Sequence, residues 1–563
     1  MEPRAFELRT QRLGPLPLVN HYLERLGLLG LFERFVPTTD PRCRLSYAHG
    51  LGVLLRSIIT EREPLYRLGE VVSTFAPEGF GLTTEQVRHL GDDAVGRALD
   101  RLFDADRGSL LTEIVLAGVE RFDLSLAELH NDSTTVKFTG QYAAARGRSM
   151  RGKKAPYITY GYSKDHRPDL KQLLFILTST EDGGVPVQFR CEAGNHNDAR
   201  THEESWEALC RVAGRPAFLY VADSKLCGAQ AMEHIHTRGG RFVTVLPRSR
   251  LEDREFRQWI QDHEPEWEKV WDRPNPRRKR GPRDRWYVSA YHLPSRESWP
   301  VIWVYSELLR QKQSHSRRER IARAEQELRG LADHYLHGRP RKRARQEVWK
   351  QIDSVLESQR VKRYLQVTLE SVEQHSYRQE HRGRPGSKTK YVRTTKRRWH
   401  IRWRVLEDAI AYDLKSDGMY PLLTNDRSLT PRQVLEAHKR QPTIEKRFKQ
   451  TKTVHEIAPV LLKNEGRVEA LFFLYFVALL VQALIERDLH RAMAREAIDE
   501  LPLYPEERTT RRPTAEQVLR LFTLLQRARL YQGKREVQAF EPELTDLQKQ
   551  ILALLRVPKS LYR

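Results

Sequence analysis

The chain of 563 residues is poor in cysteine, with four residues, Cys43, Cys191, Cys210 and Cys227, and no Cys-x-x-Cys pair. This scarcity excludes a disulfide-stabilised scaffold and a zinc site of the usual thiolate spacing, and it fits a reducing compartment. The sequence also lacks a Gly-x4-Gly-Lys-Ser/Thr phosphate loop and a His-Glu-x-x-His zinc motif. We therefore expect no ATP requirement and no zinc-protease chemistry.

No hydrophobic run is long enough to span a bilayer. The longest covers Ala470–Ile485, contains Gln482 and is flanked by Glu469 and Glu486, whereas a membrane helix needs about 20 apolar residues. This run predicts a buried core helix. The first residues contain no apolar signal core, so we expect neither secretion nor a membrane partner.

Positive charge, by contrast, is abundant. Lys and Arg number 97 and Asp and Glu 74, which gives a formal net charge of +23. Such an excess is expected of a protein whose partner is a polyanion, and nucleic acid is the first candidate. Aromatic residues make up 9% of the chain, too many for a disordered basic tail, so a folded core is expected.

The length predicts several domains. We expect a helical N-terminal domain over residues 1–120, where helical packing and a helix-turn-helix that reads DNA are both open readings. A catalytic core is predicted over residues 121–248 and 430–500, interrupted by an insertion over residues 249–429. A helical C-terminal region is predicted over residues 501–563.

The core prediction depends on the order of strands and helices. We expect strands over Leu126–Asp132, Gln172–Ser179 and Val185–Cys191, a helix over Glu203–Val212, a strand over Ala217–Asp223, a helix over Gly228–Thr237 and a strand over Phe242–Leu246. Gly183-Gly184 suits the hairpin turn before the third strand. Three strands, a helix, a strand, a helix and a strand is the order of a ribonuclease-H-like α/β core, and α/β is the fold class we predict.

The insertion combines strand-like stretches with a helical arm. The strand-like stretches are Trp286–Tyr291, Val301–Tyr305, Trp399–Val405 and Ala409–Leu414, and the arm is predicted from the apolar seam that includes Ile321, Ala324 and Leu328. A structural role for these helices and a grip on DNA are equally open.

A basic segment next to the predicted arm favours contact with phosphates. Arg382–Arg404 contains ten Lys or Arg residues and no acidic residue, with Tyr391, Trp399 and Trp403 interleaved. Because a cation that docks on a phosphate releases counterion, we expect Arg397, Arg398 and Trp399 to bind DNA. Core packing is the alternative reading for Trp399 and for the other tryptophans of the insertion.

Two carboxylates follow neighbouring strands of the predicted core. Asp132 ends the first strand and Asp223 ends the fourth. Because parallel neighbours deliver their carboxyl ends to one edge of a sheet, both side chains should meet there. Hard oxygen ligands of this kind suit Mg²⁺ or Mn²⁺, and a third carboxylate from a helix would complete a site for two ions.

Glu445 is the candidate for that third ligand. Pro442 suits the first position of a helix and places Glu445 in its first turn, while Ile444 and Phe448 would face the core. Lys452 lies seven residues further, about 10 Å along the same helical face. That spacing suits contact with a DNA phosphate beside the metals.

The sequence resembles the DDE transposases of bacterial insertion sequences, in the branch with a Tyr-x2-Arg-x3-Glu-x6-Lys signature. The motifs that carry the resemblance are His130–Thr135 around the first Asp, Gly161–Gln172 before the second strand, Gly194–Asp198 after the third, Tyr220–Lys225 around the second Asp, and Asp417-Gly418 with Thr424-Asn425 before the helix of Glu445. The resemblance covers most of the chain.

The signature itself is incomplete. Glu445 and Lys452 match, but His438 stands at the Tyr position and Gln441 at the Arg position. In the family these two positions handle DNA near the transferred strand, so His438 and Gln441 are predicted at the DNA, with Arg440 or Arg447 as substitutes. Lys164 and Arg167, in a basic loop, are predicted to contact DNA too, although a plain surface loop is the alternative.

The resemblance implies a DNA transposase that cuts and joins the ends of its own element. It implies catalysis by Asp132, Asp223 and Glu445 with two Mg²⁺ ions, replaceable by Mn²⁺, about 3.5–4 Å apart. It also implies double-stranded DNA as partner, a homodimer in the synaptic complex and a cytoplasmic, nucleoid-associated location in bacteria. The alternatives are a DNA-binding derivative whose catalysis has decayed and a hydrolytic nuclease of the same fold.

Overall fold

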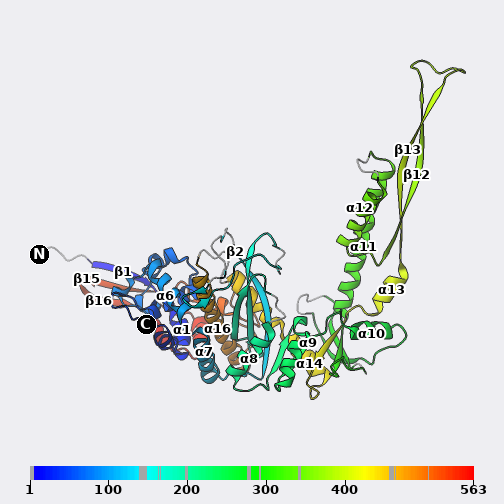
Figure 1. The fold of residues 1–563 in the computed structure, drawn as a ribbon. Helices are drawn as coiled ribbons and strands as arrows, with labels where there is room; N and C mark the ends of the chain where they lie inside the picture. The colour runs from blue at the N-terminus through cyan, green and yellow to red at the C-terminus, as the bar shows by residue number, and fades with distance from the viewer. Residues whose placement is uncertain are drawn as a thin grey trace. The chain divides into compact units, whose positions relative to one another are not determined.

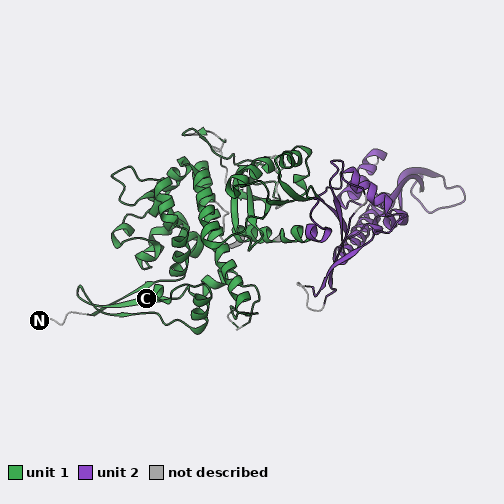
Figure 2. Ribbon diagram, turned by 90° about the horizontal axis from the view of Figure 1, so that it is seen from below, with its two compact units in different colours: residues 1–244, 424–426, 436–563 green, residues 245–423, 427–435 purple. Residues whose placement is uncertain are grey.

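The computed structural model describes residues 6–138, 142, 147, 149–162, 164, 167–196, 201–275, 281–290, 293–339, 344–454, 462, 464–504, 506 and 508–563. The chain divides into two compact units (Figure 2). Unit 1 contains residues 1–244, 424–426 and 436–563, and unit 2 contains residues 245–423 and 427–435. The five-part division predicted from the sequence is finer than these units and stays a prediction.

The N-terminal part of unit 1 is built mainly from short helices. They are α1 (Leu16–Arg25), α2 (Leu28–Phe35), α3 (Tyr47–Thr60), α4 (Leu68–Val72), α5 (Thr84–Val87), α6 (Asp92–Asp104) and α7 (Arg107–Phe122), with the 3₁₀ turns η1 (Leu65–Arg67) and η2 (Pro77–Phe80). Side-chain oxygens of Ser46 and Asp106 cap the N-termini of α3 and α7. The helix α6 buries Val95, Leu99 and Leu102 along one face, as its apolar spacing predicts.

The two ends of the chain also form a small antiparallel sheet, which the prediction of helical terminal regions did not include. β1 (Phe6–Arg12) pairs with β15 (Gln526–Gln532), which pairs with β16 (Arg535–Phe540). Most of β1 is exposed, and its short alternation of apolar and charged residues is a weak signal in the sequence. The C-terminal helices are α17 (Ala515–Leu521) and α18 (Asp546–Leu554), followed by the 3₁₀ turn η6 (Lys559–Tyr562).

The centre of unit 1 is a mixed sheet in the order β6-β5-β2-β7-β8. Its strands are β2 (Glu128–Phe138), β5 (Lys171–Thr180), β6 (Pro186–Ala193), β7 (Leu219–Ala222) and β8 (Arg241–Val245). β5 is antiparallel to both β2 and β6, whereas β2, β7 and β8 run parallel. A mixed α/β fold with the predicted strand order is therefore confirmed, including the turn at Gly183-Gly184.

Helices complete this layer. α8 (Thr201–Ala213) precedes β7 and α9 (Ala229–Thr237) precedes β8, while β3 (Ser149–Met150) and β4 (Lys153–Lys154) pair in a minor hairpin. The predicted core helix is α16 (Glu465–Arg495), which contacts α1, α3, α6 and β6 (Figure 1). By length and composition α16 could cross a membrane, but 89% of its most apolar stretch is buried inside the protein. That burial confirms its prediction as a core helix.

Unit 2 contains four strands that pair antiparallel in the order β14-β11-β10-β9. The strands are β9 (Glu268–Arg273), β10 (Asp284–Ala290), β11 (Val301–Ser306) and β14 (Met419–Thr424), accompanied by α10 (Leu251–Trp259). Trp303 is fully buried and stacks on Phe256 with ring centroids 3.5 Å apart. The strand predicted over Ala409–Leu414 is wrong, because these residues belong to the helix α13 (Glu407–Lys415). Acidic residues in its first turn and Lys415 in its last suit the helix dipole.

An arm of two helices and a long hairpin forms the rest of unit 2 (Figure 1). α11 (Glu307–Leu336) and α12 (Arg345–Ser358) pack against the hairpin of β12 (Leu365–Gln379) and β13 (Tyr391–Val405). The seam predicted through Ile321, Ala324 and Leu328 is confirmed, since all three are buried in the core of the arm. β12 escaped the sequence analysis because much of it is polar.

Trp399 belongs to that core, not to a DNA-binding surface. Its side chain is 7% exposed and packs in the same cluster as Ile401 and Leu369. The expectation that Trp399 binds DNA is therefore corrected. Odd-numbered residues of β13 face the helices at this point, and the apolar face of the hairpin needs a large ring to fill the space.

We expect Trp399→Ala to destabilise the arm by about 3–5 kcal/mol, the usual cost of removing a buried Trp side chain. Urea unfolding and hydrogen exchange of the α12 amides measure this change. Tyr391→Ala, on an exposed position of the same strand, is the matched control and should change stability by less than about 0.5 kcal/mol. Equal effects of the two substitutions would contradict the assignment of Trp399 to the core.

Candidate active site

Parallel pairing of β2 and β7 brings two carboxylates to one edge of the sheet. Asn131 pairs with Ala222, so the residues that follow them, Asp132 and Asp223, lie side by side where β7 ends. The carboxylate of Asp132 accepts a hydrogen bond from the backbone N–H of Ser133 at 2.7 Å. Both aspartates line one small pocket. The predicted meeting of Asp132 and Asp223 at this edge is thus present in the structure.

Asp223 is held by the turn that follows its strand. It caps the 3₁₀ turn η4 (Ser224–Leu226), and its side chain accepts a hydrogen bond from the backbone N–H of Lys225 at 3.1 Å. The backbone carbonyl of Asp223 accepts a hydrogen bond from the hydroxyl of Thr244 on β8 at 2.6 Å. Together these contacts hold both the backbone and the carboxylate of Asp223 in place. A metal ligand has to be positioned in this way by the residues around it.

The electrostatics of Asp132 show how closely the acidic residues act on one another. Burial raises the pKa of Asp132 to about 6; Lys164 and the Ser133 N–H oppose this rise, and the negative charges of Asp223 and Glu445 add to it. Three carboxylates from β2, the end of β7 and a distant helix therefore act on one location.

Lys164 supplies the positive charge next to this pair. Its ammonium group donates hydrogen bonds to the carbonyl and the hydroxyl of Ser133, at 2.5 and 2.6 Å, and lies 3.9 Å from Oδ1 of Asp132. The sequence predicts Lys164 in a basic loop, and in the structure this loop brings it next to Asp132. Its contact with DNA stays a prediction.

Glu445 comes from α15 (Pro442–Lys449), which packs against β2 and β5. Pro442 begins the helix, as predicted, and Ile444 and Phe448 are buried toward the core. Glu445, on the same helix, is exposed. The helix therefore anchors itself by its apolar face and leaves the carboxylate available.

The helix changes type before Lys452. After Lys449 the chain continues as a π-helical turn, η5 (Gln450–Val454), in which more residues complete each turn than in an α-helix. The expected α-helical alignment of Glu445 and Lys452 on one face is therefore corrected. The hydroxyl of Thr451 donates to the carbonyl of Arg447 at 2.9 Å, and such back-bonding is one way to distort a helix.

Arg447 is a buried structural residue, which corrects its prediction as a DNA contact. Its guanidinium is 1% exposed and pairs with Glu486 of α16 at 2.7 Å. It also donates to the carbonyls of Gly183 and Gly184, at 2.7 and 2.9 Å, and to the side chain of Gln450. These bonds use the planar fork of arginine, and no phosphate can reach it.

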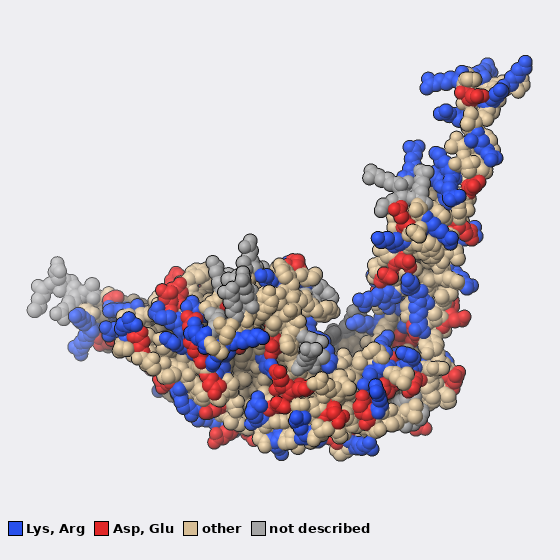
Figure 3. All heavy atoms as spheres, in the orientation of Figure 1, with Lys and Arg blue, Asp and Glu red and all other residues tan. Residues whose placement is uncertain are grey.

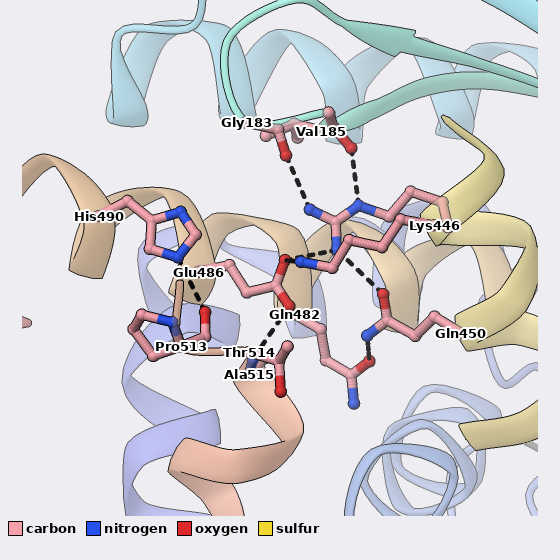
Figure 4. A network of polar contacts seen from close by, with 12 residues as sticks. Gly183, Val185, Lys446, Gln450, Gln482, Glu486, His490, Pro513, Thr514 and Ala515 are labelled. Carbon is pink, nitrogen blue, oxygen red and sulfur yellow. Dashed lines mark hydrogen bonds and ion pairs between the residues drawn. The ribbon is translucent and has the colours of Figure 1, made fainter. Parts of the chain in front are cut away.

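Glu486 is the centre of this network, shown in Figure 4. Besides Arg447 it pairs with Lys446 at 3.0 Å, and it accepts a hydrogen bond from the backbone N–H of Ala515 at the start of α17. Sequence analysis treated Glu486 only as the polar end of an apolar run. A carboxylate that interrupts a buried helix is itself a signal of a buried ion pair.

We expect Arg447→Met to destabilise unit 1 by about 3–5 kcal/mol, because it leaves Glu486 buried with only the partly exposed Lys446 as counter-ion. Urea unfolding measures the loss. Lys449→Met, which removes a positive charge from an exposed position of the same helix, is the control. A normal stability of Arg447→Met with a reduced salt dependence of DNA binding would instead restore Arg447 as a DNA contact.

The two positions that depart from the signature lie where α14 (Pro431–Arg440) meets α15. Burial, together with the charges of Lys439 and His130, lowers the pKa of His438 to about 3. Gln441 is half-buried at the start of α15. Arg440, a predicted substitute, pairs with Glu128 at 2.6 Å and Glu181 at 3.4 Å. These residues surround the N-terminus of the helix that carries Glu445.

We expect acid to destabilise the protein partly through His438. A histidine near pKa 6.5 when unfolded and about 3 when folded takes up its proton only in the unfolded chain, so stability falls as pH drops below about 6.5. At pH 5 the loss from this one group is about 1–2 kcal/mol. Urea unfolding at pH 7 and pH 5 should show a smaller loss for His438→Asn than for the wild type. His381→Asn, on an exposed turn, should behave like the wild type, and a wild-type loss in His438→Asn would contradict the assignment.

The other predicted DNA contacts lie away from the carboxylates along the chain. Arg167 is exposed and pairs with Asp169 at 2.7 Å. Arg397 and Arg398 lie on β13 of the arm, where Arg397 is exposed and Arg398 donates a hydrogen bond to Gln374 at 3.1 Å. His166, Asn197 and Asp198, parts of the motifs singled out in the sequence, lie outside the described residues.

The donors at the sheet edge fit a hard divalent cation. Asp132 and Asp223 are oxygen ligands, and Mg²⁺ commonly takes one or two protein carboxylates and completes its shell with water and substrate phosphate oxygens. Among the residues that the structure describes, no three Asp, Glu, His or Cys side chains converge closely enough to bind one ion together. Glu445 is therefore a third charge near the pair and does not close a three-ligand cage with it.

Comparison with known proteins covers only part of the chain. Residues 8–116 match a family described as "Domain of unknown function (DUF4277)". This match includes most of the N-terminal helices and stops before β2. No curated protein matches the chain.

The solved structures similar to this chain include transposases bound to DNA. A piggyBac transposase synaptic complex with hairpin DNA has 10% sequence identity and a TM-score of 0.27, over 53% of this chain and 63% of that one. A Mos1 transposase paired-end complex with left transposon end has 13% identity and a TM-score of 0.13, over 36% and 58%. A Mos1 mariner paired-end complex with Mn has 12% identity and a TM-score of 0.14, over 40% and 65%. The chain thus spans less than two thirds of each of these proteins, and overlaps of this size do not establish a shared mechanism.

Proposed function

We propose that this protein is a DDE-type DNA transposase of the insertion-sequence kind, which cuts and joins DNA ends by metal-dependent phosphodiester chemistry on a ribonuclease-H-like core. The observation that carries the proposal is the adjacency of Asp132 and Asp223 at the ends of paired parallel strands, with the charge of Glu445 acting on the same location. The net charge of +23 supports DNA as the substrate.

Asp132 and Asp223 would hold Mg²⁺ or Mn²⁺, and Glu445 would hold the second of two ions or orient the reacting group beside them. When bound, the metals activate a hydroxyl for in-line attack and stabilise the leaving oxygen. Lys164 lies next to Asp132, where its ammonium group can neutralise an incoming phosphate. Lys452 would contact the DNA from the π-helical turn. Gln441 and His438 would contact the DNA close to Glu445.

The reaction requires no ATP in this proposal, and the acting form is a homodimer that holds two DNA ends. The protein acts in the bacterial cytoplasm, associated with the nucleoid, and its DNA substrate is the flanks of its own gene. Arg167 and Arg398 would bind the DNA backbone outside the site.

Two variants test the chemistry. With the gene's native DNA, flanks included, and Mn²⁺ or Mg²⁺, the wild type should make defined breaks at the two flanking ends and join them to new DNA. Asp132→Asn and Glu445→Gln should each reduce both steps roughly 10²–10³-fold, because each removes several kcal/mol of charge stabilisation. A chelator should abolish both steps in the wild type. Breaks and joined products are mapped by sequencing.

Glu496→Gln, which neutralises an exposed carboxylate at the end of α16, is the matched control and should keep wild-type activity. Full activity of Glu445→Gln would exclude Glu445 from the site. Cutting without joining would indicate a hydrolytic nuclease of the same fold.

A second candidate is a DNA-binding derivative whose catalysis has decayed. It is favoured by His438 and Gln441 at the Tyr and Arg positions of the signature and by the low pKa that keeps His438 neutral. DNA binding without any break in Mg²⁺ or Mn²⁺ would support this candidate. Restoration of cleavage by His438→Tyr with Gln441→Arg would show that these two positions caused the decay.

A further inference from the structure

The hairpin of the arm extends past its own hydrophobic core. β12 and β13 pair over fifteen residues each, from Leu365 opposite Val405 to Gln379 opposite Tyr391, a ribbon about 50 Å long. Its proximal half packs on α11 and α12. Its distal half is exposed on both faces, as the 64% exposure of Tyr377 on one face and the 49% exposure of Val392 on the other show. A two-stranded ribbon of this kind gains little stability by itself in water, which suggests a partner.

The charge of the distal ribbon indicates what that partner is. Residues 371–398 contain nine Lys or Arg residues and two acidic residues, and Figure 3 shows blue side chains along this part of the arm. A surface with this excess attracts a polyanion. The ribbon is also narrow enough for the major groove of B-DNA, which admits a two-stranded β-ribbon.

The register assigns the two faces of the ribbon different roles. Residues directly opposite each other in an antiparallel pair point to the same face, and the faces alternate along each strand. Leu369 and Ile401 are a buried pair, so odd-numbered residues of both strands face the helices. Even-numbered residues form the opposite face, which we call the outer face.

The outer face is basic along its length and polar in its middle. Its members are Gln366, Thr368, Glu370, Val372, Gln374, Ser376 and Arg378 on β12, and Val392, Thr394, Lys396, Arg398, His400, Arg402 and Arg404 on β13. Five of these are Lys or Arg and one is acidic. Helices cover the inner face of the proximal half, so only the outer face is open to one ligand over the whole ribbon.

Ser376 and Thr394 lie opposite each other between the cations of the outer face. Hydroxyls in this position can read base edges while flanking cations hold phosphates. The side chains of Arg378 and Lys396, on either side of this pair, make no hydrogen bond or ion pair with any residue that the structure describes. Their charges are not neutralised within the described chain.

We infer that the outer face of the distal β12–β13 ribbon inserts into the major groove of double-stranded DNA, with Ser376 and Thr394 toward the base edges and Arg378 and Lys396 toward the phosphates. The inference rests on the proposed function in taking DNA as the substrate. It goes further in naming the DNA groove, the face of the ribbon and the residues that make the contact, and none of these depends on the metal chemistry.

The test compares two pairs of substitutions on the same ribbon. Arg378→Gln with Lys396→Gln removes two charges from the outer face, and Arg393→Gln with Arg397→Gln removes two from the inner face. All four positions are exposed, so folding should be unchanged. Binding of the full chain to a duplex of about four helical turns is measured without divalent metal, over a range of salt concentrations.

The outer pair should lower the slope of log affinity against log salt by about 1.8, that is about 0.9 for each lost phosphate contact, and the inner pair should lower it by much less. Dimethyl sulfate footprinting shows which groove of the DNA the ribbon occupies. The wild type and the inner pair should protect guanine N7 in the major groove over about one helical turn, and the outer pair should lose that protection.

Four results would overturn the inference. The first three are equal slopes for the two pairs, guanine N7 protection that survives in the outer pair, and protection of adenine N3 in the minor groove instead. Tighter binding to single-stranded DNA or to RNA than to the duplex would overturn it as well. Failure of the proposed function can be told apart from failure of the ribbon inference. A wild type that binds and protects DNA without cutting it would contradict the proposed function and leave the ribbon inference intact. A wild type that cuts DNA while the outer pair keeps its footprint would contradict only the ribbon inference.

Discussion

The parallel pairing of β2 with β7 is the constraint on which the candidate site depends. Asn131 opposite Ala222 sets the register, and a slip of one residue would turn Asp132 to the other face of the sheet. The same register places Asp223 where the chain leaves β7 and turns into η4. Because the strands are buried on both sides, the packing of the sheet specifies the position of both carboxylates, and catalysis in the proposed mechanism inherits that precision.

The site carries an electrostatic cost that the surrounding structure offsets. Burial and two neighbouring carboxylates raise the pKa of Asp132 to about 6, and Lys164 is the nearby charge that opposes the rise. A divalent cation would relieve the same repulsion more completely. The helix of Glu445 cannot drift away from this location, because Arg447 ties it to Glu486 of the core helix and to the turn at Gly183-Gly184. A buried ion pair of this kind contributes position more than stability.

The arm combines a packed base with an exposed tip. Its helices and the proximal hairpin share an apolar core that takes up Trp399, while the distal hairpin has no core and a large positive charge. One pair of strands thus packs on helices near its base, and the proposed DNA contact lies near its tip. The alternation of side chains in a β-ribbon permits this division, since each strand presents one face to the core and the other to a ligand.

The amino-acid sequence by itself determined the succession of strands and helices along the chain that build the central sheet, the core helix α16, and the candidate residues Asp132, Asp223 and Glu445, because periodicity, turn residues and strand ends are local properties of the chain. Local patterns missed the terminal sheet of β1, β15 and β16, since its strands are short and exposed and their partners lie at opposite ends of the chain. They also assigned Arg447 and Trp399 to DNA and Ala409–Leu414 to a strand. Only the tertiary structure decided these points: whether a charged or aromatic side chain is buried depends on residues far along the chain, such as Glu486 for Arg447 and Leu369 for Trp399, and no local pattern contains that information.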